Sequence, residues 1–114
     1  MAIEIRRILL EQHEVQAVLN VYAKLEENNF PIGFVVGFEI KEEVPLTLFV
    51  SVQLPNGEQV GVEMDEESLV DAMIHFCIAT KVPVSRKSKK TMKLKDDKLS
   101  FDMSLINPSF STNL

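Results

Sequence analysis

Apolar and polar residues alternate in several short runs of the chain, and two longer stretches repeat their apolar residues at helical spacing instead. The even-numbered positions are apolar over 34–40, and the same holds over 46–54 and 60–64. A period of two is typical of a strand with one buried face, whereas a period near 3.6 predicts an amphipathic helix. The patterns predict strands over 34–40, 46–54, 60–64, 92–94 and 99–105, and helices over 11–27 and 66–80.

The first ten residues admit two interpretations. Ile3 and Ile5 alternate with charged residues, which predicts a short strand ahead of the first helix. The alternative is one long helix that begins at Ile3. We favour the strand because the apolar period changes at about Glu11. The dipeptide Asn28–Asn29 can adopt the left-handed conformation that ends helices, and Pro31 forbids continuation.

Two hairpin turns follow from the parity of the apolar positions, because directly opposite residues of an antiparallel pair share a face. The apolar positions are even-numbered on both sides of residues 55–57, which predicts a three-residue loop with Gly57 left-handed. They change from even to odd across Asp96–Asp97, which predicts a two-residue turn. The resulting pairs are Leu54 with Glu58, Val52 with Val60, Val50 with Val62, Leu48 with Met64, Leu94 with Leu99, and Met92 with Phe101.

The predicted element order is β-α-β-β-β-α-β-β. Strands with one apolar face need cover on one side only, and two helices can supply it. The sequence therefore predicts an α+β fold, a two-layer sandwich in which an antiparallel sheet of about five to six strands carries two helices on one face. A chain of 114 residues fits a single domain. We place that domain at 1–106 and expect a flexible C-terminal tail at 107–114.

Composition indicates a soluble, cytoplasmic protein. Cys77 is the single cysteine, so the chain cannot form an internal disulfide. The charged N-terminus lacks the apolar segment of a signal peptide. No apolar run approaches the roughly twenty residues that a membrane-spanning helix needs, so we expect no membrane partner.

Charge is distributed unevenly along the chain. Residues 1–80 contain four basic and fourteen acidic residues, whereas residues 81–98 contain eight basic and two acidic ones. The candidate residues for binding an anionic partner in this basic segment are Arg86, Lys87, Lys89 and Lys90.

The basic segment has three interpretations. It could contact nucleic-acid phosphates through residues 86–98, or it could dock to an acidic protein surface. The third interpretation is a solvated loop followed by lysines that protect an edge strand. The segment contains no aromatic residue for base stacking and the chain has a pI of about 5.0, which argues against a dedicated nucleic-acid-binding protein.

No motif in the chain predicts catalysis, a cofactor or a metal site. The four glycines form no phosphate-binding pattern. Cys77 falls on the apolar face of its helix, which predicts a buried, inert thiol. Asp71 and His75 lie one helical turn apart and could form an acid/base pair, but we favour the simpler interpretation, a solvent-exposed polar stripe. The acidic cluster 63–67 is better explained by Asp65 capping the following helix than by calcium binding.

Two apolar residues fall on the strand faces that we assign to solvent. These are Val35 and Phe49, on neighbouring predicted strands, and they are our candidate interface residues. Together with the absence of a catalytic motif, they favour a non-enzymatic protein-interaction or accessory module without a cofactor, which binds a protein partner or a second copy of itself. The alternative is a nucleic-acid-binding accessory domain that uses residues 86–98.

Overall fold

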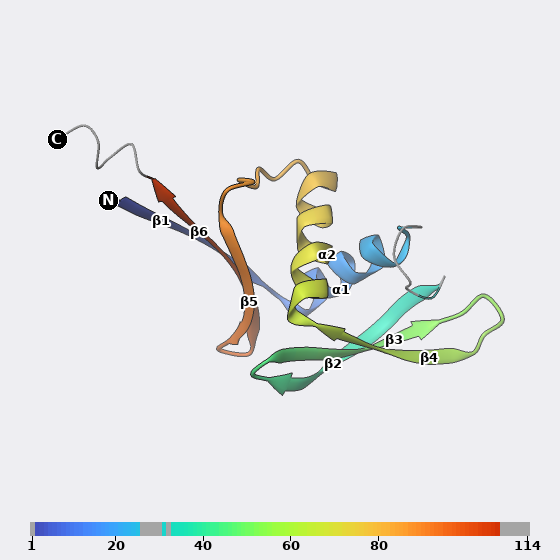
Figure 1. Ribbon diagram of the computed structural model, residues 1–114. Helices are drawn as coiled ribbons and strands as arrows, with labels where there is room; N and C mark the ends of the chain where they lie inside the picture. Colours follow the sequence, from blue (N-terminus) through green and yellow to red (C-terminus); the bar gives the residue numbers. More distant parts are fainter. Residues whose placement is uncertain (1, 26–30, 32, 108–114) are drawn as a thin grey trace.

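The structure, a computed structural model, describes residues 2–25, 31 and 33–107 (Figure 1). It is an α+β fold, and its elements follow in the predicted order. They are β1 (Ala2–Leu10), α1 (Gln12–Ala23), β2 (Phe34–Glu43), β3 (Leu46–Gln53), β4 (Gln59–Asp65), α2 (Glu66–Ala79), β5 (Lys89–Lys95) and β6 (Lys98–Asn107).

The ends of the chain match the sequence interpretation in part. The strand β1 confirms that a strand precedes the first helix, so the single long helix is wrong. Helix α1 ends at Ala23, four residues before the predicted end. The predicted terminator Asn28–Asn29 lies outside the described residues. Asn107 belongs to β6, and the rest of the predicted tail also lies outside the described part.

The strands form two three-stranded antiparallel sheets rather than the single sheet that we predicted. One sheet has the order β1-β6-β5 and the other the order β2-β3-β4. Strands β1 and β6 come from opposite ends of the described chain and pair from Ala2 with Asn107 to Leu10 with Leu99. Alternation along a strand reveals which face is buried but not which strand lies beside it, which is why the prediction of one sheet was wrong.

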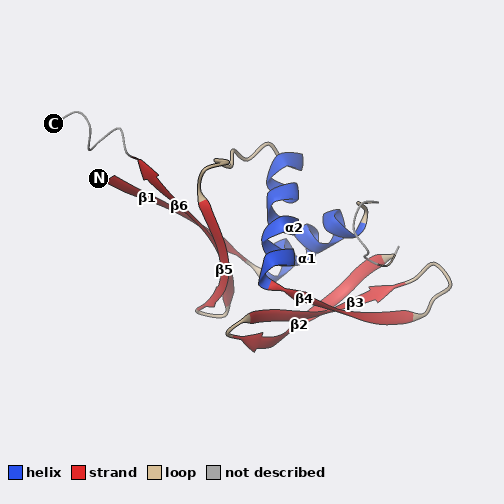
Figure 2. Cartoon of the chain, viewed as in Figure 1, coloured by secondary structure: helices blue, strands red, loops and turns tan. Residues whose placement is uncertain are grey.

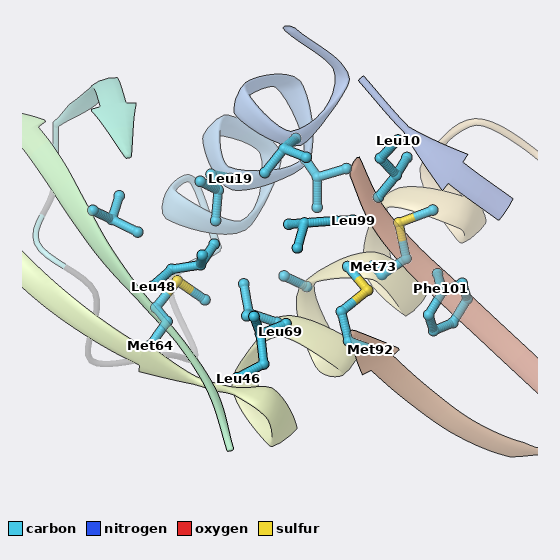
Figure 3. Close-up of a cluster of buried hydrophobic side chains, with 14 of the residues drawn as sticks. Leu10, Leu19, Leu46, Leu48, Met64, Leu69, Met73, Met92, Leu99 and Phe101 are labelled. Carbon is cyan, nitrogen blue, oxygen red and sulfur yellow. The ribbon is translucent and has the colours of Figure 1, made fainter. Parts of the chain in front are cut away.

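The two helices lie in the angle between the sheets and join them through one core (Figure 2). Helix α1 packs against β2, α2 packs against β4 and β5, and the helices contact each other. Figure 3 shows side chains from both helices and both sheets meeting in this core. Leu19 of α1, Leu48 of β3 and Phe101 of β6 are all fully buried.

Both predicted hairpins are confirmed with their registers. Between β3 and β4, the Gly57 N–H donates to the Leu54 carbonyl at 2.9 Å, and Gly57 has a φ of 91°. Val50 lies opposite Val62 and Leu48 opposite Met64, as parity requires. Between β5 and β6, the turn residues 96–97 are both left-handed, with φ values of 51° and 64°, and Leu94 lies opposite Leu99.

The strand β2 contains an irregularity that reverses the predicted orientation of Val35. The register against β3 shifts between Val35 and Gly37, so Val36 is an extra residue on this strand. Val35 therefore faces the core together with Phe38, although one number is odd and the other even. Val35 is fully buried, and its predicted exposure to solvent is wrong.

Side chains of α1 bind the backbone of Val35 at the open edge of β2. The Val35 N–H donates to Asn20 Oδ1 at 2.8 Å. The Val35 carbonyl accepts from Gln16 Nε2 at 3.2 Å and from Asn20 Nδ2 at 3.3 Å. These bonds satisfy buried backbone groups that have no strand beside them, and they hold Val35 against the helix.

Candidate interaction surface

The strands β1 and β6 extend past the rest of the molecule as a two-stranded arm, which we define as residues 2–6 and 103–107 (Figure 1). Strand β5 accompanies β6 no further than Ser104, which lies opposite Lys89. The radius of gyration of 16.1 Å reflects this extension, because a compact chain of this length has about 13 Å. The arm therefore presents two faces and an edge away from the core.

The outer face of the arm carries two exposed isoleucines. Ile3 is 62% exposed and Ile5 is 68% exposed, although both stand in the middle of a regular strand pairing. The alternating pattern of β1 predicts a strand with an apolar face, but not that Ile3 and Ile5 point away from the core while Ile8 and Leu10 of the same strand face it. The sequence interpretation therefore missed these residues as a surface feature.

The inner face of the arm forms one wall of a groove of about 660 Å³. The opposite wall is the segment that follows α2 and includes Pro83 and Val84. The arm side is lined by Met103 and Leu105 of β6 and by residues 4–6 of β1, so Ile5 also borders the groove. Arg6 crosses the groove, since its Nη1 donates to the Pro83 carbonyl at 2.8 Å. The groove is therefore largely apolar, with one basic side chain, Arg6, and one acidic side chain, Glu4, in its lining. Its volume falls in the range of pockets that bind ligands or peptide side chains.

A charged network fastens the base of the arm on its outer side. Asp102 of β6 accepts from Arg7 Nε at 2.9 Å and from Ser100 Oγ at 2.7 Å, and Lys93 Nζ lies 3.4 Å from its Oδ2. Burial raises the pKa of Asp102, but the hydrogen bonds from Arg7 and Ser100 and the charge of Arg7 outweigh it, so the pKa lies below its ordinary value. This network links the three strands of the sheet across their outer face.

The basic segment borders the groove, and the structure divides its candidate residues. Arg86 and Lys87 are exposed in the loop, whereas Lys89 and Lys90 belong to β5 rather than to the loop. Lys89 is exposed, but Lys90 is half-buried and its Nζ donates to the Ser88 carbonyl at 2.9 Å. Within the described residues, Arg86, Lys87 and Lys89 form no ion pair with a carboxylate.

Of the lysines after residue 90, Lys93 and Lys95 lie on the edge strand β5, whereas Lys98 is the first residue of β6. Lys93 contacts Asp102, and Lys98 Nζ lies 2.9 Å from Glu11 Oε1. Strand β5 is an edge of its sheet, as the edge-protection interpretation assumed.

The predicted interface pair of Val35 and Phe49 is not brought together. Val35 is buried, while Phe49 is 43% exposed on the outer face of β3, opposite Glu39 and Glu63. The Phe49 ring covers Gly61 so closely that a Cβ added there would collide with the ring. Phe49 thus lies between two carboxylates, and a role for it in an interface stays a prediction.

The residues considered for catalysis are also placed. His75 Nε2 lies 3.7 Å from Asp71 Oδ1, which is longer than a hydrogen bond, and the His75 ring is tilted against Tyr22 at a centroid distance of 6.5 Å. Burial, followed by the charge of Asp71, raises the pKa of Tyr22. Cys77 is buried, as predicted, and burial raises the pKa of its thiol.

The acidic cluster before α2 caps that helix, as predicted. Asp65 Oδ1 accepts from the Ser68 N–H at 2.9 Å, and this bond lowers the pKa of Asp65.

In the described part of the chain, no three His, Cys, Asp or Glu side chains gather as they would around a metal ion. Neither α1 nor α2, the helices of that part, is long and apolar enough to cross a membrane. No family model, curated protein or solved structure matches the chain.

Proposed function

We propose that this chain is a non-enzymatic protein-interaction or accessory module, and that the arm and the groove beneath it are its docking surface. The observation that carries the proposal is the exposure of Ile3 and Ile5 on a regular strand that projects from the core. Two large apolar side chains next to each other on one face lose contact with water when a partner covers them.

The surroundings of the isoleucines support the same proposal. The groove on the inner face offers an apolar floor next to the Arg6 guanidinium, and the exposed Arg86 and Lys87 lie in the loop that borders it. A protein partner with apolar anchors and acidic flanks would complement this surface.

The test compares arm variants with a control of equal exposure elsewhere. Ile3→Thr and Ile5→Thr together keep the β-branched shape that strands favour and remove much of the apolar surface. Ile78→Ala is the control, because Ile78 is 67% exposed on α2, outside the arm, and alanine favours helices. Partner complexes isolated by crosslinking in cells should be lost in the arm variant and kept in the control. A strictly monomeric protein without any crosslinked partner would contradict the proposal.

A second candidate function is nucleic-acid binding through the basic segment. It is favoured by the exposure of Arg86, Lys87 and Lys89, none of which is paired with a carboxylate in the described residues. Such contacts would bind phosphates without reading sequence. The strongly acidic remainder of the chain opposes this function.

Fluorescence anisotropy with a labelled single-stranded RNA and a labelled DNA duplex at low salt tests this candidate. Lys87→Glu with Lys89→Glu should weaken binding about tenfold or more and flatten its dependence on salt. Lys41→Glu is the control, because Lys41 lies on the other sheet and already pairs with Glu63. Nucleic-acid binding through the basic segment would be refuted if the double variant bound as tightly as the Lys41→Glu control, or if the wild type did not bind at all.

A further inference from the structure

We infer that two copies of this chain associate by antiparallel pairing of their β1 strands, centred on Ile5. The inference rests on the proposed interaction function and deepens it, since it names a second copy as the partner. The resulting assembly is a continuous six-stranded sheet with a two-fold axis through its middle, because each copy contributes the sheet β1-β6-β5.

The first argument is the open edge of β1. This strand is the outermost of its sheet, and no described element pairs with its far side. The edge of β2 differs, because Gln16 and Asn20 bind the backbone of Val35 there. An unsatisfied strand edge presents backbone donors and acceptors that a further strand can pair with. The arm projects from the core, so a second copy can approach this edge (Figure 1).

The second argument is symmetry, which limits the register. In an antiparallel pair, directly opposite residues share a face. The two-fold axis must therefore pass between one residue and the same residue of the second copy, which lie directly opposite each other. A centre at Glu4, Arg6 or Arg7 would place two like charges opposite each other. A centre at Ile5 places two isoleucines together and pairs residues 2–8, whereas a centre at Ile8 would pair only residues 6–10.

The third argument is charge complementarity in that register. With Ile5 at the centre, Glu4 lies opposite the second copy's Arg6, and symmetry creates this pair twice. Glu4 forms no ion pair within the described residues of its own chain. Arg6 uses Nη1 for the Pro83 carbonyl, and a guanidinium has further N–H donors that can reach a carboxylate.

The same register gathers the exposed apolar residues. Ile5 faces its counterpart directly, and Ile3 of each copy lies diagonally next to Ile5 of the other, within reach of side-chain contact. The isoleucines that are 62% and 68% exposed in one chain then form one cluster at the centre of the joined sheet.

Cysteine crosslinking tests the register. In the Ile5→Cys variant the two Cα atoms would lie about 4.5–5.5 Å apart, which a disulfide can span. In the Ile3→Cys variant the two copies of residue 3 are offset by four residues, about 13 Å, which a disulfide cannot span. Mild oxidation of the full chain should give about tenfold more disulfide dimer for Ile5→Cys than for Ile3→Cys. The native Cys77 is buried, and the wild-type chain, in which it is the single cysteine, measures the background of disulfide dimer.

Charge exchange, read by light scattering coupled to size exclusion, tests the ion pairs. Glu4→Arg should weaken the dimer about tenfold, because the new arginine faces Arg6 of the other copy at both symmetric positions. Combining Glu4→Arg with Arg6→Glu should restore the dimer, because opposite charges then face each other again. Preferential crosslinking of Ile3→Cys, or a wild-type monomer at all concentrations, overturns the inference. A third outcome separates the two proposals: the wild type is monomeric, but Ile3→Thr with Ile5→Thr still loses a partner that is crosslinked in cells. That outcome overturns the dimer and leaves the proposed function standing.

Discussion

The edge strands β1 and β2 have similar lengths and similar alternation, but the structure treats their open edges differently. Strand β2 has ten residues and β1 has nine. At β2, an extra residue turns Val35 into the core, and Gln16 and Asn20 of α1 bind its backbone. At β1, the outer edge has no partner in the described chain, and Ile3 and Ile5 stay exposed.

The difference lies in the edge backbone rather than in apolar exposure, because Phe34 of β2 is 57% exposed and Leu10 of β1 is buried. Side chains of α1 bind the β2 backbone at Val35, whereas no described element pairs with the outer edge of β1. Helix α2 has 14 residues and therefore a length of about 21 Å. Strand β6 has ten residues and a length of about 33 Å. The exposure of Ile3 and Ile5 does not depend on this difference in length, because they share the outer face of β1 with Arg7, whereas the buried Leu10 of the same strand faces the core.

The largest expected effect contrasts a core residue beside β2 with an arm residue. Leu48→Ala should lower the free energy of unfolding by about 3 kcal/mol, because Leu48 is fully buried and its removal leaves a cavity. Ile5→Ala should change it by about 0.5 kcal/mol or less, because Ile5 is 68% exposed. Urea denaturation of dilute protein measures both. Equal losses would mean that the arm packs as the core does, and the comparison would fail.

A second prediction concerns the hydrogen bonds from α1 side chains to the edge of β2. Asn20→Ala should cost about 2 kcal/mol, since the buried Val35 N–H loses its acceptor. The control is Asn56→Ala, because Asn56 Oδ1 binds the Glu58 N–H in an exposed turn, where water can replace it. Hydrogen exchange of the Val35 amide should accelerate in the first variant only. Unchanged exchange would show that α1 does not protect this edge.

A smaller effect concerns the network at the base of the arm and depends on pH. The pKa of Asp102 is lowered in the folded state, so its contribution is present above the pKa of an unfolded aspartate, about 3.9, and is lost as pH falls through the folded value. Asp102→Asn should therefore cost about 1.5 kcal/mol at pH 7 and progressively less below pH about 4.

The control for Asp102 is Asp96→Asn, in a turn whose left-handed conformation asparagine also adopts. Chemical denaturation of wild type and variants across pH measures the difference. A constant difference between wild type and Asp102→Asn at every pH would show that the charge of Asp102 is not what stabilises the base of the arm.

The local elements and both hairpins could be predicted from the sequence, because each rests on a short-range rule. Parity across residues 55–57 and 96–97 determined the loop lengths, and Asp65 marked the start of α2. The orientation of Val35 could not be predicted in the same way. Its reversal depends on one extra residue in β2 and on amide side chains of α1, which are nearby only in the folded chain.

The candidate site was predictable only in its charged part. The basic residues at 86–90 stand out by composition, but nothing in the sequence shows that Lys90 turns inward to the Ser88 carbonyl. Ile3 and Ile5 have the pattern of a buried strand face. Their exposure follows from the pairing of β1 with β6, whose residues lie about as far apart in the chain as its length allows.

The sequence by itself determined the order of the elements, the faces of most strands, the two hairpin registers and the separation of charge along the chain. These features depend on side-chain period, turn conformation and capping, which act over a few residues. Only the tertiary structure decided that the strands form two sheets, that β1 pairs with β6, and that the arm projects beyond the helices. Those outcomes depend on contacts between segments that are distant in the sequence and on the core that both sheets share.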